Sequence, residues 1–321
     1  MLTPAPNQSP HIDTPTEKRD PQSSVLDDGL QYETTDREPL RIALTSIKSL
    51  RSAVRSTMHN TLTEMFASHT YVGMVDESRR LAAIQSGVKL YLIDYGLACN
   101  EFFYQIGLTD FGNFGVIKLE PPPKVVDLLQ IAAEVEQEQH HNKNGDEAES
   151  IFANAAEMVA QTLFERREML DEYFSMKISD EGELLTIPLL LKGYVPSLAK
   201  LPLFLLRLGP YVDWNSEEEC FRTFLRELAA FYTPEKLPIP PPSAASKESA
   251  GEAESTQPNP MDETSSEEDP MISNRRLQMA RMLEYAIFPA LRARLVATSR
   301  MLQGVVEVAD LKGLYRVFER C

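Results

Sequence analysis

The distribution of charge along the chain limits most strongly what it can fold into. The 321 residues carry a formal net charge of −16. Three polar segments account for this charge, with −5 in residues 1–40, −5 in residues 134–150 and −7 in residues 234–270, so that the rest of the chain is near +1. The first and last segments are also rich in Pro and Ser, and such segments bury too little apolar surface to fold. We therefore expect a disordered linker over 1–40, an acidic loop over 134–150 and a disordered acidic insertion over 234–272.

Composition excludes several classes of protein. Hydrophobic residues make up 43% and charged residues 25%, which is ordinary for a globular domain. No run of about 18 apolar residues occurs, so we expect no membrane contact. Three cysteines without a CxxC pair fit a reducing cytosol or nucleus. Without a dense Lys/Arg stripe, direct DNA binding is neither required nor excluded.

The remaining segments show apolar residues at regular spacing. Steps of three and four residues predict helices, and alternation predicts strands. Helices and strands mixed without regular βαβ alternation favour an α+β fold. The predicted strands are 70–75, 81–85, 88–93, 115–119 and 203–208, with a hairpin joining 174–178 to 184–189. The predicted helices are 45–66, 96–111, 125–133, 151–174, one starting at the Ser216/Glu219 capping box, 275–296 with a kink at Pro289, and 308–316.

Motifs of catalysis are absent from the sequence. It contains no glycine-rich phosphate loop, no GxSxG and no zinc-ligand spacing. Cys99 and Cys220 lie among apolar helical positions, so we expect both to be buried packing residues. Cys321 differs because the last residue offers a thiol and a carboxylate that can reach one divalent cation. A chain end without any ligand role is the simpler interpretation of that residue.

Several strings, taken in order, resemble one known family. The strings are Tyr71-Val-Gly, Lys89-Leu-Tyr-Leu, Glu101-Phe-Phe-Tyr-Gln-Ile, Pro188-Leu-Leu-Leu-Lys-Gly-Tyr-Val-Pro and Leu314-Tyr-Arg-Val-Phe-Glu-Arg-Cys. Together they resemble the C-terminal region of the eukaryotic MutL homologue of DNA mismatch repair, the subunit that ends in Phe-Glu-Arg-Cys.

This resemblance implies a particular architecture. It implies an α+β, two-subdomain MutL C-terminal fold in which residues 41–133 and 273–321 form a discontinuous dimerisation subdomain. Residues 151–233 would form the inserted outer subdomain and its connecting helix. It also implies that an N-terminal ATPase, with its ATP site, precedes this region in a longer protein, and that residues 1–40 are the end of its linker.

The resemblance also implies partners and a division of labour. The expected partner is a PMS-type MutL subunit or the meiotic MutL paralogue, which carries a nicking endonuclease with DQHAxxE, ACR and CxH motifs. None of these motifs occurs here, so we expect this chain to hold no catalytic residue and no cofactor, with zinc or manganese at the partner's site. Further implied partners are a MutS-type recognition complex and a repair exonuclease, with DNA contacted indirectly, in the nucleus.

The implied interface residues lie mostly at the chain end. By resemblance, the last residue can be a metal ligand in trans at the partner's site, while plain packing at the interface remains open. An aromatic residue on a terminal tail gains little unless a partner buries it, which favours Phe318 as an anchor. Two other functions remain open: an endonuclease completed by dimerisation, and an adaptor domain unrelated to DNA. The candidate partner-binding residues are Gln85, Leu314, Tyr315, Phe318, Glu319, Arg320 and Cys321.

Overall fold

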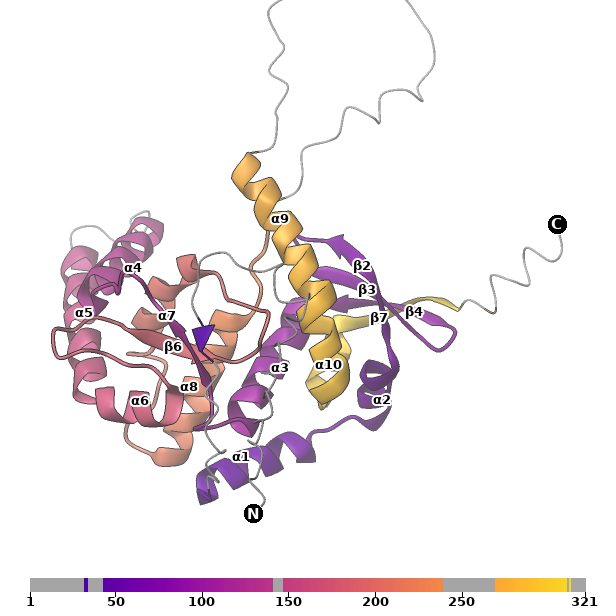
Figure 1. The fold of residues 1–321 in the computed structure, drawn as a ribbon, viewed down its shortest axis with the longest axis horizontal. Helices are drawn as coiled ribbons and strands as arrows, with labels where there is room; N and C mark the ends of the chain where they lie inside the picture. Colours follow the sequence, from indigo (N-terminus) through magenta and orange to yellow (C-terminus); the bar gives the residue numbers. More distant parts are fainter. Residues whose placement is uncertain (1–31, 34–42, 141–146, 239–268, 311, 313–321) are drawn as a thin grey trace, which may run out of the picture.

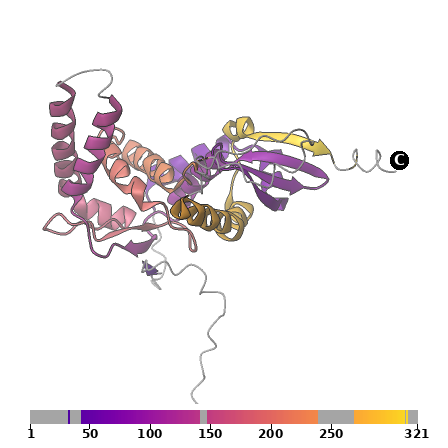
Figure 2. The same ribbon diagram turned by 90° about the horizontal axis from the view of Figure 1, so that it is seen from above.

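The described residues form two lobes, each built on an antiparallel sheet. This computed structural model describes residues 32–33, 43–140, 147–238, 269–310 and 312. One sheet has four strands in the order β2-β3-β4-β7, and the other has three in the order β1-β5-β6. Figures 1 and 2 show the two sheets at opposite sides of the molecule, with helices between and around them.

The first lobe combines segments from both ends of the chain. Its sheet buries one face against helices, and the Tyr71 ring packs on the Phe288 ring at a centroid distance of 4.4 Å. The strands are β2 (Thr70–Asp76), β3 (Leu81–Ser86), β4 (Lys89–Asp94) and β7 (Val305–Asp310). The helices are α1 (Thr45–Ser56), α2 (Asn60–Ser68), α3 (Tyr95–Thr109), α9 (Pro270–Met282), the π-helix η3 (Leu283–Ile287), α10 (Phe288–Arg294) and the 3₁₀-helix η4 (Ser299–Gly304).

The second lobe is mainly helical and, apart from strand β1, comes from the middle of the chain. Its small sheet contains β1 (Tyr32–Glu33), β5 (Gly115–Lys118) and β6 (Thr186–Leu189). The long helices α4 and α5 pack against each other and against α7. The helices are α4 (Val125–His140), α5 (Glu147–Glu165), α6 (Arg167–Phe174), the 3₁₀-helix η1 (Leu198–Lys200), α7 (Leu201–Arg207) and α8 (Glu217–Tyr232).

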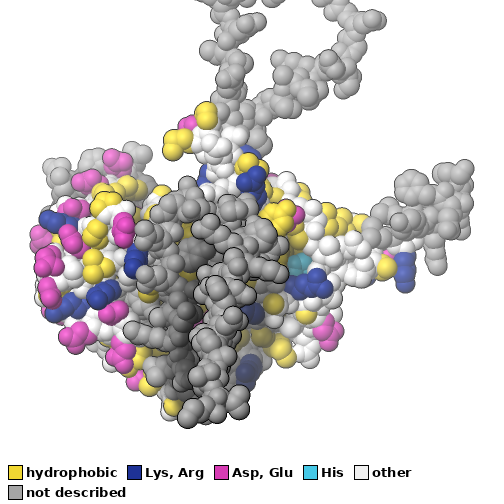
Figure 3. All heavy atoms as spheres, viewed as in Figure 1, with side chains coloured by type: hydrophobic (Ala, Val, Ile, Leu, Met, Phe, Trp, Pro, Cys, Tyr) yellow, Lys and Arg dark blue, Asp and Glu magenta, His cyan; other side chains and the backbone are white. Residues whose placement is uncertain are grey.

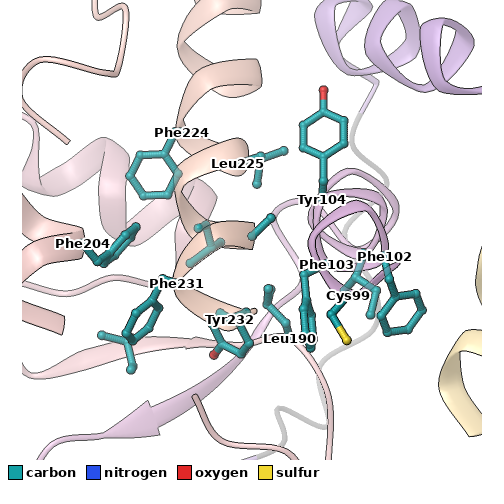
Figure 4. Packing of buried hydrophobic residues seen from close by; sticks show 14 of the residues in the cluster. Cys99, Phe102, Phe103, Tyr104, Leu190, Phe204, Phe224, Leu225, Phe231 and Tyr232 are labelled. Atoms are coloured by element: carbon teal, nitrogen blue, oxygen red, sulfur yellow. The ribbon is translucent and has the colours of Figure 1, made fainter. Parts of the chain in front are cut away.

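Packing of α3 against α8 joins the two lobes. Of the 15 residues of α3, 12 are buried, and a helix buried all round must have neighbours on several sides. The Phe103 ring lies 5.3 Å from the rings of both Tyr194 and Tyr232. Figure 4 shows Phe103 and Tyr232 between the two helices, while Phe224 points from the far side of α8 towards Phe204. The second lobe is therefore anchored to the first through one apolar layer.

Polar groups in this layer are paired. The buried Glu101 carboxylate on α3 accepts a hydrogen bond from Arg226 on α8 at 3.0 Å and another from Gln105 at 3.0 Å. The Lys200 ammonium group donates to three carbonyls at the end of α8, at 2.7–2.9 Å. Burial lowers the pKa of Lys200 to about 8, so the side chain remains protonated at neutral pH. Removing either partner of the Glu101–Arg226 pair would be strongly destabilising, because the remaining charge would be left without its partner.

Most predicted elements are confirmed, but two predicted helices are each divided. Residues 45–66 form α1 and α2, because His59 turns the chain and caps α2, with its Nδ1 accepting from the Leu62 amide at 3.1 Å. Residues 151–174 likewise divide between α5 and α6. In the predicted helix over 275–296, the chain passes through the π-helical turn η3 just before Pro289 rather than kinking at that residue alone.

Three predictions of element type are wrong in whole or in part. Residues 203–207 belong to helix α7 rather than a strand, because a short apolar run does not distinguish a strand from a buried helix. Within the predicted helix over 308–316, residues 308–310 end strand β7, which pairs with β4, whereas Lys312 is helical and the other residues lie outside the described part of the chain. Of the predicted hairpin, the second arm forms β6 while the first contributes the single bridge Ile178–Leu184.

The segment boundaries also differ from those expected. Residues 134–140 and 147–150 extend α4 and α5, where the sequence predicted an acidic loop. The sequence grouped residues 115–133 with the first subdomain, whereas β5 and α4 contact β6, α5 and α7 of the second lobe. Strand β1 lies within the predicted linker and pairs with β5. None of the described helices combines the length and the apolarity needed to cross a membrane.

The substitution Phe224→Ala tests the packing of the hydrophobic core of the second lobe, on the side of α8 that faces away from α3. The ring is fully buried and stacks on Phe174 at a centroid distance of 3.8 Å. We expect the free energy of unfolding to fall by about 3–5 kcal/mol, because a large cavity is left behind. Tyr285→Ala is the control, since that ring is exposed and its loss should change stability by less than about 0.5 kcal/mol. Chemical denaturation measures both, and equal effects would contradict this packing.

Candidate interaction surface

The four-stranded sheet has one face packed on helices and one open face. Residues of one strand alternate between the two faces. Ala82, Ile84 and Ile93 are almost completely buried on the helix-covered side. The alternate positions of the same strands therefore point to the opposite, open side.

Two rows of paired residues cross this open face, and neither contains a charged residue. One row pairs Ala83 with Leu92 and Leu92 with Val306. The other pairs Gln85 with Leu90 and Leu90 with Ala309. Leu90 and Leu92 are only partly buried, and Val306 is 58% exposed. Since charged residues are depleted at the centre of interfaces, these rows have the composition of a contact surface.

The strands at the two edges extend this surface. In β2, shifts of register occur around Val72 and Val75, and both side chains are more than half exposed. At the other edge, Val308 of β7 is also exposed, and the Lys89 ammonium group forms an ion pair with Glu307 at 2.8 Å that ties β7 to β4. Contiguous exposed apolar surface of this kind marks a site of protein contact.

Gln85 is the one predicted interface residue that the described part of the chain contains. It is exposed on β3, within the uncharged rows, and its Nε2 donates to the Gly87 carbonyl at 3.1 Å. The open face therefore includes this predicted position. The other candidates lie outside the described residues: Leu314, Tyr315, Phe318, Glu319, Arg320 and Cys321.

The sequence alone did not predict which apolar residues form the open face. Leu92 and Val306 lie 214 positions apart in the chain and meet only because β7 pairs with β4. The alternation in residues 88–93 predicts a half-buried strand but does not reveal which side has no cover. The apolar surface can be recognised only once the order of the strands in the sheet is known.

The two cysteines among the described residues are buried in the hydrophobic core, where their side chains contribute to packing. Cys99 and Cys220 are free and buried, as expected, and burial raises the pKa of both thiols, that of Cys220 to about 11. Such thiols remain protonated and unreactive at neutral pH. Among the described residues, no three His, Cys, Asp or Glu side chains come together in a way that could hold a metal ion.

Comparison with known proteins agrees with this fold. A family model described as "DNA mismatch repair protein Mlh1 C-terminus" matches residues 43–321. The chain belongs to this family. The α+β fold with its two antiparallel sheets is the one expected from the resemblance, and the assignment to the MutL homologues of mismatch repair is confirmed.

Relatives from three organisms are similar over most of this chain. The DNA mismatch repair protein MLH1 of Saccharomyces cerevisiae is 40% identical over 298 residues, which cover 90% of this chain and 35% of the relative. A putative MutL protein homolog 1 of Schizosaccharomyces pombe is 33% identical over 97% of this chain and 39% of the relative. The Mlh1 protein of Dictyostelium discoideum is 32% identical over 89% and 30%. The chain thus spans about a third of the length of these relatives.

Proposed function

We propose that this chain is the dimerisation region of a DNA mismatch repair subunit and that it pairs through its open sheet face with a second MutL-type subunit. The observation that carries the proposal is the pair of uncharged rows around Leu92 and Val306. Membership of the Mlh1 C-terminal family supplies the repair context.

Exposing the apolar side chains of this sheet to water is unfavourable in free energy, and a partner that covers them removes this penalty. Permanent interfaces are large and more hydrophobic than the rest of a protein's surface. Leu90, Leu92 and Ala309 in these rows are partly exposed and Val306 is largely exposed, and such side chains gain about 25 cal/mol for each Å² of apolar surface removed from water. A partner that presents a similar apolar face would cover them without having to desolvate a charge.

A PMS-type subunit is the partner that we propose first, with the meiotic MutL paralogue as an alternative. In this arrangement the partner holds the endonuclease site with its zinc or manganese, and this chain is an accessory without catalytic residues. ATP would be used by an N-terminal region of the whole protein.

The wider setting follows from the same family. We propose that the whole protein acts in the nucleus, with a MutS-type complex and a repair exonuclease as further partners and DNA contacted through the assembly. The tail from Phe318 to Cys321 would insert against the partner's nuclease site, with Cys321 contributing a thiolate or carboxylate ligand to the metal.

Charges introduced on the open face should separate the two subunits. We expect Leu92→Glu with Val306→Glu to weaken binding to the PMS-type C-terminal region at least about 30-fold, or about 2 kcal/mol in total, since the complex would have to bury two unpaired carboxylates in an apolar contact. The matched control is Met158→Glu with Leu203→Glu, two exposed apolar residues of the second lobe at 70% and 42% exposure. Titration calorimetry on the purified subunits measures both pairs. Equal weakening by the control, or none by the sheet variant, would refute the proposed face.

Deletion of the C-terminal tail should remove the DNA-nicking activity of the pair but leave the binding between the two subunits largely intact. We expect deletion of Phe318–Cys321 to abolish nicking of supercoiled DNA by the manganese-loaded pair, while the affinity between the subunits changes by less than about tenfold, or 1.4 kcal/mol. Cys321→Ala tests the ligand by itself and should reduce nicking in the same direction. Full nicking by the truncated pair would contradict a role in trans, and nicking by this chain alone would show that it is itself the enzyme.

A further inference from the structure

A separate cavity opens on the helical side of the first lobe. It has a volume of about 190 Å³ and lies between α1, the second half of α3 and the segment that follows α10. In Figure 1, α1 crosses below the ends of α3 and α10, and these three helices contribute to the lining of the cavity. Its floor is formed by Phe102 and Ile106, both almost completely buried, with Val54 and Val296 on the sides.

The volume of the cavity limits what it can hold. An apolar cavity of about 150 Å³ holds a benzene ring. A cavity of about 190 Å³ therefore fits one phenyl-sized side chain and is too small for the face of a helix. The polar groups at its back are already used, because Gln105 donates to the Val296 carbonyl at 2.7 Å and accepts from the Val296 amide at 3.0 Å. The interior thus favours an apolar group without hydrogen bonds of its own.

Three arginines surround the opening of the cavity. Arg51 donates to the Leu108 carbonyl at 2.9 and 2.6 Å, and Arg294 holds both oxygens of Asp110 at 2.7 and 2.8 Å. Arg55 is exposed, and within the described part of the chain its side chain has no hydrogen bond or ion pair. Asp110 neutralises one of the three charges, so the rim carries an excess of positive charge.

The positive charge continues along α1. Lys48, Arg51 and Arg55 are spaced by three and four residues and therefore lie on one side of the helix. Arg55 in the last turn is explained in part by the helix dipole, but Lys48 lies in the first turn, where a positive charge is unfavourable. The acidic Glu217 and Glu218 bind Ser46 and Ser49 on the opposite side of α1, at 2.6 and 2.9 Å. The ridge beside the cavity is therefore not neutralised by these carboxylates.

We propose that the cavity binds an acidic segment of a partner protein through one aromatic side chain. The ring would occupy the space over Phe102 and Ile106, and carboxylates on either side of it would face Arg55, Arg51 and Lys48. Charge complementarity between an acidic segment and this rim would favour its encounter and orientation. The proposal is independent of pairing through the sheet, because α3 lies between the cavity and the strands.

The test uses the full chain and fluorescein-labelled peptides. The first peptide is Ser-Glu-Asp-Phe-Asp-Glu-Ser, and three matched peptides replace its Phe by Ala, its acids by the corresponding amides, or its acids by Lys. Fluorescence anisotropy should show saturable binding of the first peptide. Affinity should fall at least tenfold for each matched peptide, and it should also fall as salt is raised from 0.05 to 0.5 M, because salt screens exposed charges.

Variants of the chain locate the binding site. Arg55→Glu should weaken binding of the first peptide at least tenfold without unfolding the chain, because the Arg55 side chain is exposed and bonds to none of the described residues. Val54→Phe should weaken it similarly by filling the cavity, while Arg79→Glu, the same charge change at an exposed position in the β2–β3 turn, should alter affinity less than twofold. Absence of saturable binding, equal binding to Arg55→Glu, or equal binding of the amide peptide would overturn the proposal.

Discussion

Burial of α3 on all sides is the constraint on which the rest of the structure depends. Only a helix with almost no exposed face can pack against a sheet on one side and α8 on the other. Phe103 fills the contact with α8, and the Glu101–Arg226 pair fixes the orientation of the two helices. Gly107 permits their close approach, because a side chain there would meet Leu225 at 2.8 Å.

This arrangement determines which surfaces remain for partners. With α3 and α10 packed on one face of the four-stranded sheet, the face with Leu92 and Val306 is left open and uncharged. The same helices, together with α1, leave a small apolar cavity with a positive rim on the other side. The first lobe therefore offers two chemically different surfaces, one broad and apolar and one narrow and basic.

Sequence reasoning predicted the parts that depend on local pattern. The strands over 70–93 and the helix over 96–111 follow from the spacing of apolar residues, and the ordered strings identified the family. Three features depend on distant contacts and could not be predicted: strand β7, whose last residues were predicted to begin a helix, helix α7 in place of a strand, and the open face itself. In each case tertiary packing, rather than local preference, selected the outcome.

Methyl NMR of the labelled chain, alone and with the PMS-type C-terminal region, would show whether the open face is the contact surface. The chemical shift of each methyl group reports on the surroundings of its own side chain in both states. We predict that the signals of Leu90, Leu92 and Val306 shift on complex formation, while those of Leu203 and Met158 in the second lobe remain unchanged. Shifts confined to Leu203 and Met158, with the sheet signals unmoved, would contradict pairing through the open face.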